Sequence, residues 1–263
     1  MASVFAAGRW KNLRRRAARR LLLNVLRSYP SELDRLDALD GLAREFGHGL
    51  CLASAFWSCD PEFQTAAEKL CEMGIKMKPG KFILYRMAQS VRDLAGDTVE
   101  CGSFMGQGSF LICMGTGNRS ERKHHIFDSF EGLSAPTAQD MRQEWSKQKF
   151  AKHDMSVPLP AVQGRLRDFP WVSYYPGWIP SRFDEVKERR FSLVHIDVDL
   201  YQPTRDSLEF FYERMVPGGF LICDDYALVE CPGATKAFDD FIADKPERRV
   251  VYIGTGQGFI VKR

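Results

Sequence analysis

The chain has 263 residues, of which 44% are hydrophobic and 27% charged, and its net charge is +3 at pH 7. This length suits one large α/β domain with an extension. The seven cysteines include no C-x-x-C pair and the five histidines show no zinc-ligand spacing, which argues against a disulfide framework and a zinc site and indicates reduced thiols in a cytoplasmic protein.

The first 31 residues carry an unusual charge pattern. They hold eight basic side chains and no acid, so the net charge of +3 leaves −5 for the rest of the chain. By its charge, that part is not expected to bind nucleic acid. Leu13, Ala17, Leu21 and Val25 recur every four residues, predicting a basic amphipathic helix. Such a helix can lie on an anionic membrane or dock on the domain or on a second copy, so we expect peripheral membrane contact or a homo-oligomer. An organelle transit segment is a further alternative.

Beyond this segment, helical and strand-like patterns alternate. Residues 32–50 and 61–95 predict helices. Strands are expected within 98–104, 124–130, 171–178, 190–201 and 218–226, helices within 107–115, 203–215 and 233–244, and a final hairpin around 255–258. Residues 134–170 are the least regular and predict a mobile loop or lid. We therefore expect an N-terminal helical extension, 1–80, and a domain with a mostly parallel sheet, 81–263.

The first strand runs into a glycine-rich turn, E-x-G-x-x-x-G-x-G-S, over residues 100–109. A dinucleotide-binding turn would need glycine at position 104, which is Phe104, so a nicotinamide-dependent oxidoreductase is the weaker alternative. Glu100 before the turn suits a cofactor that carries an ammonium or sulfonium cation. Asp128, at the end of the second strand, is placed to accept hydrogen bonds from ribose hydroxyls. Together they favour S-adenosylmethionine, although glycines in such turns also serve plain turn geometry.

Two pairs of aspartates follow strand-like runs: Asp197 and Asp199 in "HIDVDLY", and Asp224 and Asp225 in "CDDY". Strand alternation places Asp197 and Asp199 on one face. Carboxylates gathered at one sheet edge repel each other unless a cation offsets their charge. An all-oxygen set favours Mg²⁺, Mn²⁺ or Ca²⁺. Any single aspartate could instead cap a helix or pair with Arg or Lys.

These motifs resemble the macrocin O-methyltransferases, which use S-adenosylmethionine and Mg²⁺ to methylate sugar hydroxyls of bacterial natural products. The resemblance is carried by "GDTVECGSFMGQGS" (96–109), "FDSFEGL" (127–133), "HIDVDLY" (195–201), "VPGGFLICDDY" (216–226) and "PGATKAFDDF" (232–241). It implies a class I methyltransferase (Rossmann-like) fold. It also implies metal ligation by Asp197, Asp224 and Asp225, a base at Asp199, and cofactor contacts from Glu100, Gly102, Ser109 and Asp128, to which we add Ser103 and Gly106 from the same turn.

Methyl transfer to a hydroxyl needs little beyond positioning and deprotonation of the acceptor, because the cofactor already activates the methyl group. We predict that Asp199 takes the proton, that Asp197 assists as a metal ligand, and that His195 is an alternative base or a residue that orients the ligands. Gly177 and Trp178 are candidate walls of the methyl-donor or acceptor pocket. The expected acceptor is a glycoside or saccharide. A metal-dependent methyltransferase of catechols and a non-catalytic methyltransferase-like scaffold are alternatives.

Overall fold

The computed structural model describes residues 60–74, 79–119, 121–141 and 150–263, with a few scattered positions before residue 60. The chain divides into two compact units, Met1–Cys59 and Asp60–Arg263, and the elements below belong to the second. The predicted N-terminal helices lie almost wholly outside the described residues, so membrane contact and homo-oligomer formation stay predictions. Within the described part of the chain, no helix is long and apolar enough to cross a membrane.

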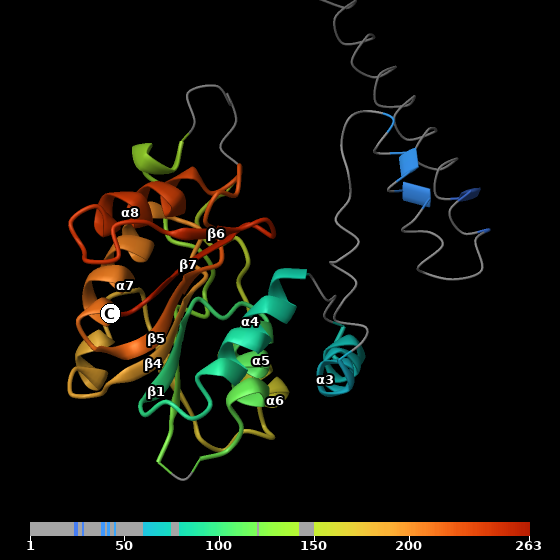
Figure 1. The fold of residues 1–263 in the computed structure, drawn as a ribbon, viewed down its shortest axis with the longest axis horizontal. Coiled ribbons are helices and arrows are strands. Elements are labelled where there is room, and N and C mark those ends of the chain that lie inside the picture. The colour runs from blue at the N-terminus through green and yellow to red at the C-terminus, as the bar shows by residue number, and fades with distance from the viewer. Residues whose placement is uncertain are drawn as a thin grey trace, which may run out of the picture. The chain divides into compact units, whose positions relative to one another are not determined.

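A seven-stranded sheet forms the centre of the second unit, with strand order β3-β2-β1-β4-β5-β7-β6 (Figure 1). Strands β1 to β5 are parallel, and β7 pairs antiparallel with both β5 and β6. This confirms the predicted mostly parallel α/β sheet with its C-terminal hairpin. The strands are β1 (Asp97–Cys101), β2 (His124–Asp128), β3 (Val172–Pro176), β4 (Phe191–Ile196), β5 (Met215–Cys223), β6 (Val251–Ile253) and β7 (Gln257–Val261).

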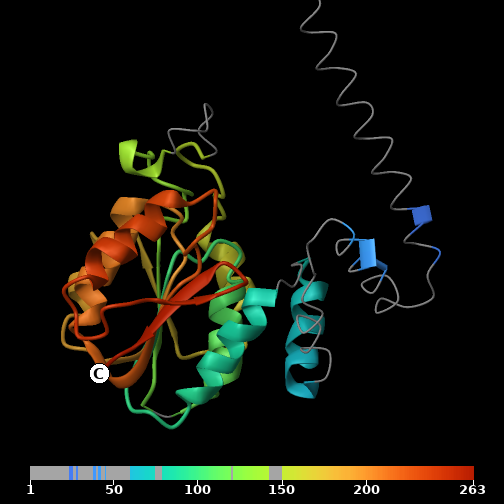
Figure 2. The ribbon, with the colours of Figure 1, turned by 45° about the horizontal axis from the view of Figure 1, so that its top comes forward.

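Helices cover both faces of the sheet, and for this reason every residue of β1 and β4 is buried. On one face, Val194 and Ile196 belong to the core that α7 and α8 share. On the other, Leu193 and Ile222 pack with residues of α4 and α5. Figure 2 shows α4 and α5, in cyan and green, on one side of the sheet, and α7 and α8, in orange and red, on the other. His195 therefore faces the α4 side.

The predicted helices within 107–115, 203–215 and 233–244 are confirmed, whereas 134–170, predicted as a loop, contains the short helix α6, and the stretch 61–95 is two helices rather than one. α3 (Pro61–Glu72) ends before Gly74, whose φ of 77° suits glycine, and α4 (Pro79–Ser90) begins at a proline. Both residues interrupt a helix, so the single-helix prediction was wrong. The remaining helices are α5 (Gln107–Thr116), α6 (Leu159–Arg165), α7 (Tyr201–Tyr212) and α8 (Pro232–Ile242), with 3₁₀ turns at Ala138–Asp140 and Phe183–Val186.

Part of the stretch predicted as a mobile loop is held against the domain. Asp140 Oδ1 accepts a hydrogen bond of 2.6 Å from the backbone N–H of Tyr201, the first residue of α7. It thereby caps a helix that has no side-chain cap of its own. A Cβ on Gly233, in the first turn of α8, would lie 2.1 Å from the same carboxylate oxygen. Glycine at this position lets the 3₁₀ turn Ala138–Asp140 sit directly on both helix starts.

Candidate functional site

The turn after β1 has glycine at two positions with a positive φ. Gly102 has a φ of 81°, and a Cβ there would lie 2.0 Å from the carbonyl oxygen of Asp197. Gly106, the N-cap of α5, also has a φ of 81°. Phe104, which stands where a dinucleotide turn has glycine, adopts a φ of 44° and is 48% exposed, an uncommon backbone conformation for a bulky residue. The turn therefore brings β1 close to the end of β4.

Asp128, at the end of β2, organises this turn. Its Oδ2 accepts hydrogen bonds from Ser103 N (2.6 Å), Ser103 Oγ (2.9 Å) and Phe104 N (3.2 Å), and its Oδ1 accepts one from Phe130 N (2.7 Å). A carboxylate oxygen offers about two acceptor sites, so Oδ1 keeps one for a ligand. The carboxylate is half-buried beside the glycine turn, and its predicted contact with a ribose hydroxyl stays a prediction.

Glu100 and Ser109 were predicted to contact the cofactor, but the structure places both inside the protein. Glu100 is 1% exposed and accepts hydrogen bonds from Ser109 N (2.8 Å) and from the Ser109 hydroxyl. Its other oxygen lies 2.9 Å from His195 Nδ1. A Cβ on Gly108 would lie 1.8 Å from that oxygen. Glu100 thus lies beneath the start of α5 and supports the turn from behind.

His195 joins this interior network to the sheet edge. It is fully buried, with Nδ1 against Glu100 and Nε2 3.2 Å from Asp224 Oδ1. Although burial opposes its charge, the hydrogen bonds to Asp224 and Glu100 raise the pKa of His195 to about 9. A doubly protonated imidazole donates from both nitrogens, so neither nitrogen is available to take a substrate proton. Both ring nitrogens of His195 thus face carboxylates of the protein, and its two predicted roles, as an alternative base or as a residue that orients the ligands, stay predictions.

The pair Asp197 and Asp224 shares a cation that the sequence analysis did not single out. Lys81, in the first turn of α4, donates from Nζ to Asp197 Oδ2 (3.0 Å) and Asp224 Oδ2 (3.1 Å). Burial alone would lower the pKa of Lys81, but the charges of Asp197 and Asp224 outweigh it and raise the pKa above its usual value. Gln257 Nε2 donates to Asp224 Oδ1 at 2.6 Å. The sequence indicated that clustered carboxylates need a cation. It did not indicate that Lys81 lies next to them, because Lys81 is more than a hundred residues away along the chain.

Asp199 and Asp225 form a separate group on the other side of the strand ends. Asp225 Oδ2 accepts from the backbone N–H of Asp199 at 2.8 Å, and Cys231 Sγ lies 3.4 Å from Asp199 Oδ1. Strand β4 ends at Ile196, and Asp199 adopts a φ of 59°. The predicted alternation, which placed Asp197 and Asp199 on one face, therefore does not continue this far. Asp199 is half-buried.

The carboxylates fit a divalent cation by their chemistry. Burial and the neighbouring carboxylates, Asp199 first, raise the pKa of Asp225 well above its usual value, and burial with Asp224 raises the pKa of Asp197. A cation would relieve this repulsion. Among the described residues, two groups have potential ligand atoms within 4.8 Å of one another: Glu100, His195 and Asp197, and Asp199, Asp225 and Cys231. The predicted ligands Asp197 and Asp225 fall in different groups and Asp224 is in neither, although the charges of Asp197 and Asp224 both act on Asp225.

Gly177 and Trp178 follow β3 at the same sheet edge. Gly177 N donates to the carbonyl of Asp128 at 2.9 Å, which fixes the loop beside the turn. The Trp178 ring is half-buried, with its centroid 6.1 Å from that of His153 and 5.9 Å from Lys152 Nζ. Trp178 therefore packs against residues of the loop between β2 and α6 and borders the region around Asp128.

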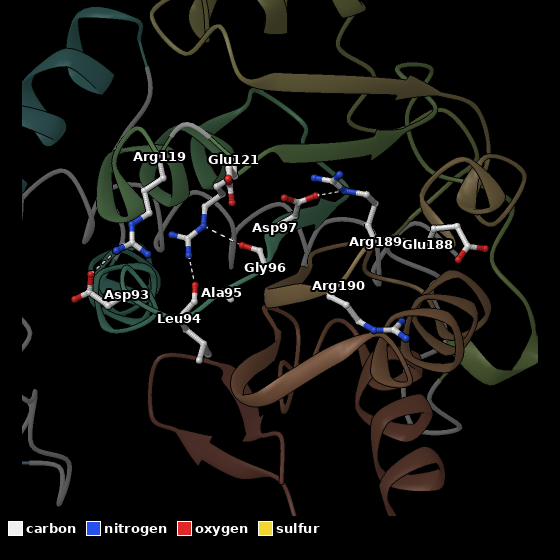
Figure 3. Close-up of a pocket in the computed structure, with 11 residues that line it drawn as sticks. Asp93, Leu94, Ala95, Gly96, Asp97, Arg119, Glu121, Glu188, Arg189 and Arg190 are labelled. Atoms are coloured by element: carbon white, nitrogen blue, oxygen red, sulfur yellow. Dashed lines mark hydrogen bonds and ion pairs between the residues drawn. The ribbon is translucent and has the colours of Figure 1, made fainter.

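A surface hollow of about 680 Å³ lies at the opposite edge, near the start of β1 (Figure 3). Arg122 donates there to the carbonyls of Val91, Arg92, Leu94 and Gly96. Asp97 accepts from Arg189 Nε (2.6 Å) and His125 Nε2 (2.8 Å). Arg122 and Asp97 in this hollow thus already bind the backbone or neighbouring side chains, whereas parallel sheets bind their ligands at the carboxyl ends of the strands.

Solved structures show the class of protein that this fold defines. The O-methyltransferase NovP matches with a TM-score of 0.56 and 23% identity over 70% of this chain and 79% of its own. The calicheamicin methyltransferase CalS11 matches with a TM-score of 0.58 and 17% identity over 92% of this chain and 90% of its own. The fold is that of the class I O-methyltransferases, as expected.

The family follows from the sequence comparison. The model of the macrocin O-methyltransferase (TylF) family matches residues 84–248, and the chain belongs to this family. It is 31% identical over 151 residues to an 8-demethyl-8-(2,3-dimethoxy-α-L-rhamnosyl)-tetracenomycin-C 4'-O-methyltransferase of Streptomyces olivaceus, a match that covers 54% of this chain and 58% of that relative. It is 29% identical over 179 residues to the mycinamicin III 3''-O-methyltransferase of Micromonospora griseorubida, covering 63% of this chain and 69% of that one.

Proposed function

We propose that this protein is an S-adenosylmethionine-dependent O-methyltransferase that acts on a hydroxyl of a sugar or of a glycosylated small molecule. The observation that carries the proposal is the juxtaposition, at one sheet edge, of the glycine turn held by Asp128 and the carboxylates that follow β4 and β5. The family and the printed names of the relatives support a glycosidic acceptor.

In this proposal, Asp128 binds the ribose and Gly102, Ser103 and Gly106 shape the turn around the cofactor. When bound, S-adenosylmethionine supplies an activated methyl group. Glu100, Ser109 and His195 act from inside the protein by holding the turn and Asp224 in place. Trp178 borders the acceptor side.

Asp199 is the proposed base. It would accept the proton of the acceptor hydroxyl, whose O–H bond is replaced by an O–H bond on Asp199, and the bound cofactor would supply the methyl group that takes the proton's place on the oxygen. Asp197, Asp224 and Asp225 would hold a divalent cation of the Mg²⁺ class, which acidifies and orients a bound hydroxyl.

Calorimetric titration of S-adenosylmethionine into the purified protein tests the cofactor. We expect binding by the wild type, binding weakened at least about tenfold in Asp128→Ala through loss of hydrogen bonds to a charged acceptor, and no heat with NADH. Asp240→Ala, which removes a surface carboxylate of α8, is the control and should bind as the wild type does. Binding of NADH in place of the methyl donor would refute the proposal.

A further inference from the structure

Lys81 is held at the strand ends by features that extend beyond its own side chain. It is 7% exposed, and the preceding Gly80 packs so closely on β7 that a Cβ there would lie 3.0 Å from Gln257 Oε1. The start of α4 can approach the sheet this closely because residue 80 lacks a side chain. The approach places the Lys81 ammonium group between Asp197 and Asp224, 3.0 and 3.1 Å from their oxygens.

Asp224 has almost no acceptor capacity left in this arrangement. Its Oδ1 is shared by His195 Nε2 (3.2 Å) and Gln257 Nε2 (2.6 Å), and its Oδ2 binds Lys81. A carboxylate has about four acceptor sites, and three are used by the chain. Asp197 Oδ2 accepts a hydrogen bond from the same ammonium group. A second cation cannot reach both oxygens while the ammonium group stays between them.

We propose that Lys81 is the internal counter-ion of Asp197 and Asp224, and that a divalent cation binds these two carboxylates only by displacing its ammonium group. The inference rests on the proposed function for the identity of the metal ligands. It adds that Lys81 competes with the metal for the same carboxylates. In the metal-free protein the Lys81 ammonium group neutralises Asp197 and Asp224, and in the metal-bound protein the cation takes its place.

Binding of Mn²⁺, measured by calorimetry and by the electron paramagnetic resonance of the free ion, tests this competition without S-adenosylmethionine or turnover. Lys81→Met should bind Mn²⁺ about tenfold or more tightly than the wild type, because the ion no longer has to break two charge-assisted hydrogen bonds. Lys81→Gln keeps a donor without the charge and should lie between the two. Lys236→Met removes a lysine from an exposed ion pair on α8 and should match the wild type.

Thermal unfolding supplies a second readout. Without metal, Lys81→Met should melt at a lower temperature than the wild type, because Asp197 and Asp224 lose their counter-ion, and Mn²⁺ should raise its melting temperature by more than it raises that of the wild type. If Lys81→Met does not fold, the comparison rests on Lys81→Gln.

Equal or weaker Mn²⁺ binding by the Lys81 variants would overturn the inference, as would the absence of Mn²⁺ binding by every variant. Neither outcome affects the titration of S-adenosylmethionine, so a failure of the competition is distinguishable from a failure of the proposed methyltransferase function.

Discussion

Asp199 combines an uncommon backbone conformation with partial burial. Its φ of 59° lies in the left-handed region, and the next residue, Leu200, donates back to Val198 O at 2.6 Å. For a non-glycine residue this conformation costs on the order of 1–3 kcal/mol, and such strain concentrates at functional sites. Asp225 holds the conformation by accepting from the Asp199 N–H. The left-handed turn thus places the Asp199 carboxylate beside Cys231, whose Sγ lies 3.4 Å from Asp199 Oδ1.

Replacing Asp199 by asparagine tests its role as the base. We expect Asp199→Asn to lower kcat by about 10²- to 10⁴-fold, the usual contribution of a general base, and to leave the affinity for S-adenosylmethionine unchanged. Asn keeps the backbone N–H bond to Asp225 and tolerates a positive φ, so folding should be retained. Methylation assays with a glycoside acceptor measure the loss.

The exposed Asp244 at the end of α8 provides the matched control, and Asp244→Asn should retain full activity. Full turnover by Asp199→Asn would show that another group takes the proton.

The sequence could predict these aspartates but not their division into two groups. Alternation along β4 correctly placed Leu193 and His195 on one face of the strand. It was wrong for Asp199, because the strand ends at Ile196 and the backbone then enters a left-handed turn. Aspartate is one of the non-glycine residues enriched at positive φ, but this preference is too weak to predict where a strand ends.

At the scale of elements, the turn between β1 and α5 is the most constrained segment of the site. Gly102 lies so close to β4 that its missing side chain decides the spacing between the turn and Asp197. The glycine pattern predicted this turn, and its strand-to-helix setting was confirmed. What the pattern could not show is that Gly102 serves contact with the neighbouring strand, because that contact joins residues almost a hundred positions apart.

Gly102→Ala should destabilise the fold by more than about 2 kcal/mol. The alanine residue would have to adopt a left-handed backbone conformation, which costs about 1–2 kcal/mol. Its Cβ would also overlap the Asp197 carbonyl oxygen. Urea unfolding followed by circular dichroism gives the free energy of unfolding.

Gly164→Ala in α6 is the matched control, since a Cβ there meets nothing within 4 Å, and it should stabilise the helix by about 0.5–1 kcal/mol. Similar effects of the two substitutions would contradict the close approach at Gly102.

On the scale of the whole molecule, the two edges of the sheet have different tasks. At the edge opposite the site, Asp97 is buried and accepts from Arg189, His125 and Lys123 N. Burial would raise the pKa of Asp97, but the hydrogen bonds from His125 and Arg189 prevail and lower it from 3.8 to about 2. This edge fastens β1, β2 and the chain before β4 to one another.

Acid stability reports on this edge. Because the pKa of Asp97 is lowered on folding, its ionised form stabilises the folded state above pH 4, and this stabilisation is lost as the pH falls toward 2. The shift of nearly two pH units corresponds to about 2 kcal/mol. We therefore expect Asp97→Asn to be less stable than the wild type by about 2 kcal/mol at pH 7, with the difference closing near pH 2. Urea unfolding at a series of pH values measures it, and a difference that stays constant down to pH 2 would contradict the assignment.

The sequence predicted the architecture of the molecule more fully than the electrostatics of its site. Alternating strands and helices, each with its own hydrophobic pattern, determined all seven strands and the mostly parallel sheet. Lys81 and Gln257 escaped prediction because they come from opposite ends of the domain and reach Asp224 only once α4 and β7 lie on the completed sheet.

Helix α4 runs from the carboxyl ends of the strands to their amino ends, and different residues hold its two ends. At its C-terminal end, the Arg122 guanidinium binds the carbonyls of Val91, Arg92 and Leu94, while its first turn carries Lys81. Twelve residues at 1.5 Å each make this helix about 18 Å long. A tilt of α4 by about 5° about the end that Arg122 holds would move the Lys81 end by about 1.5 Å, which is roughly the rise of one residue. A displacement of this size would be enough to break the contacts of 3.0 and 3.1 Å that Lys81 makes with Asp197 and Asp224.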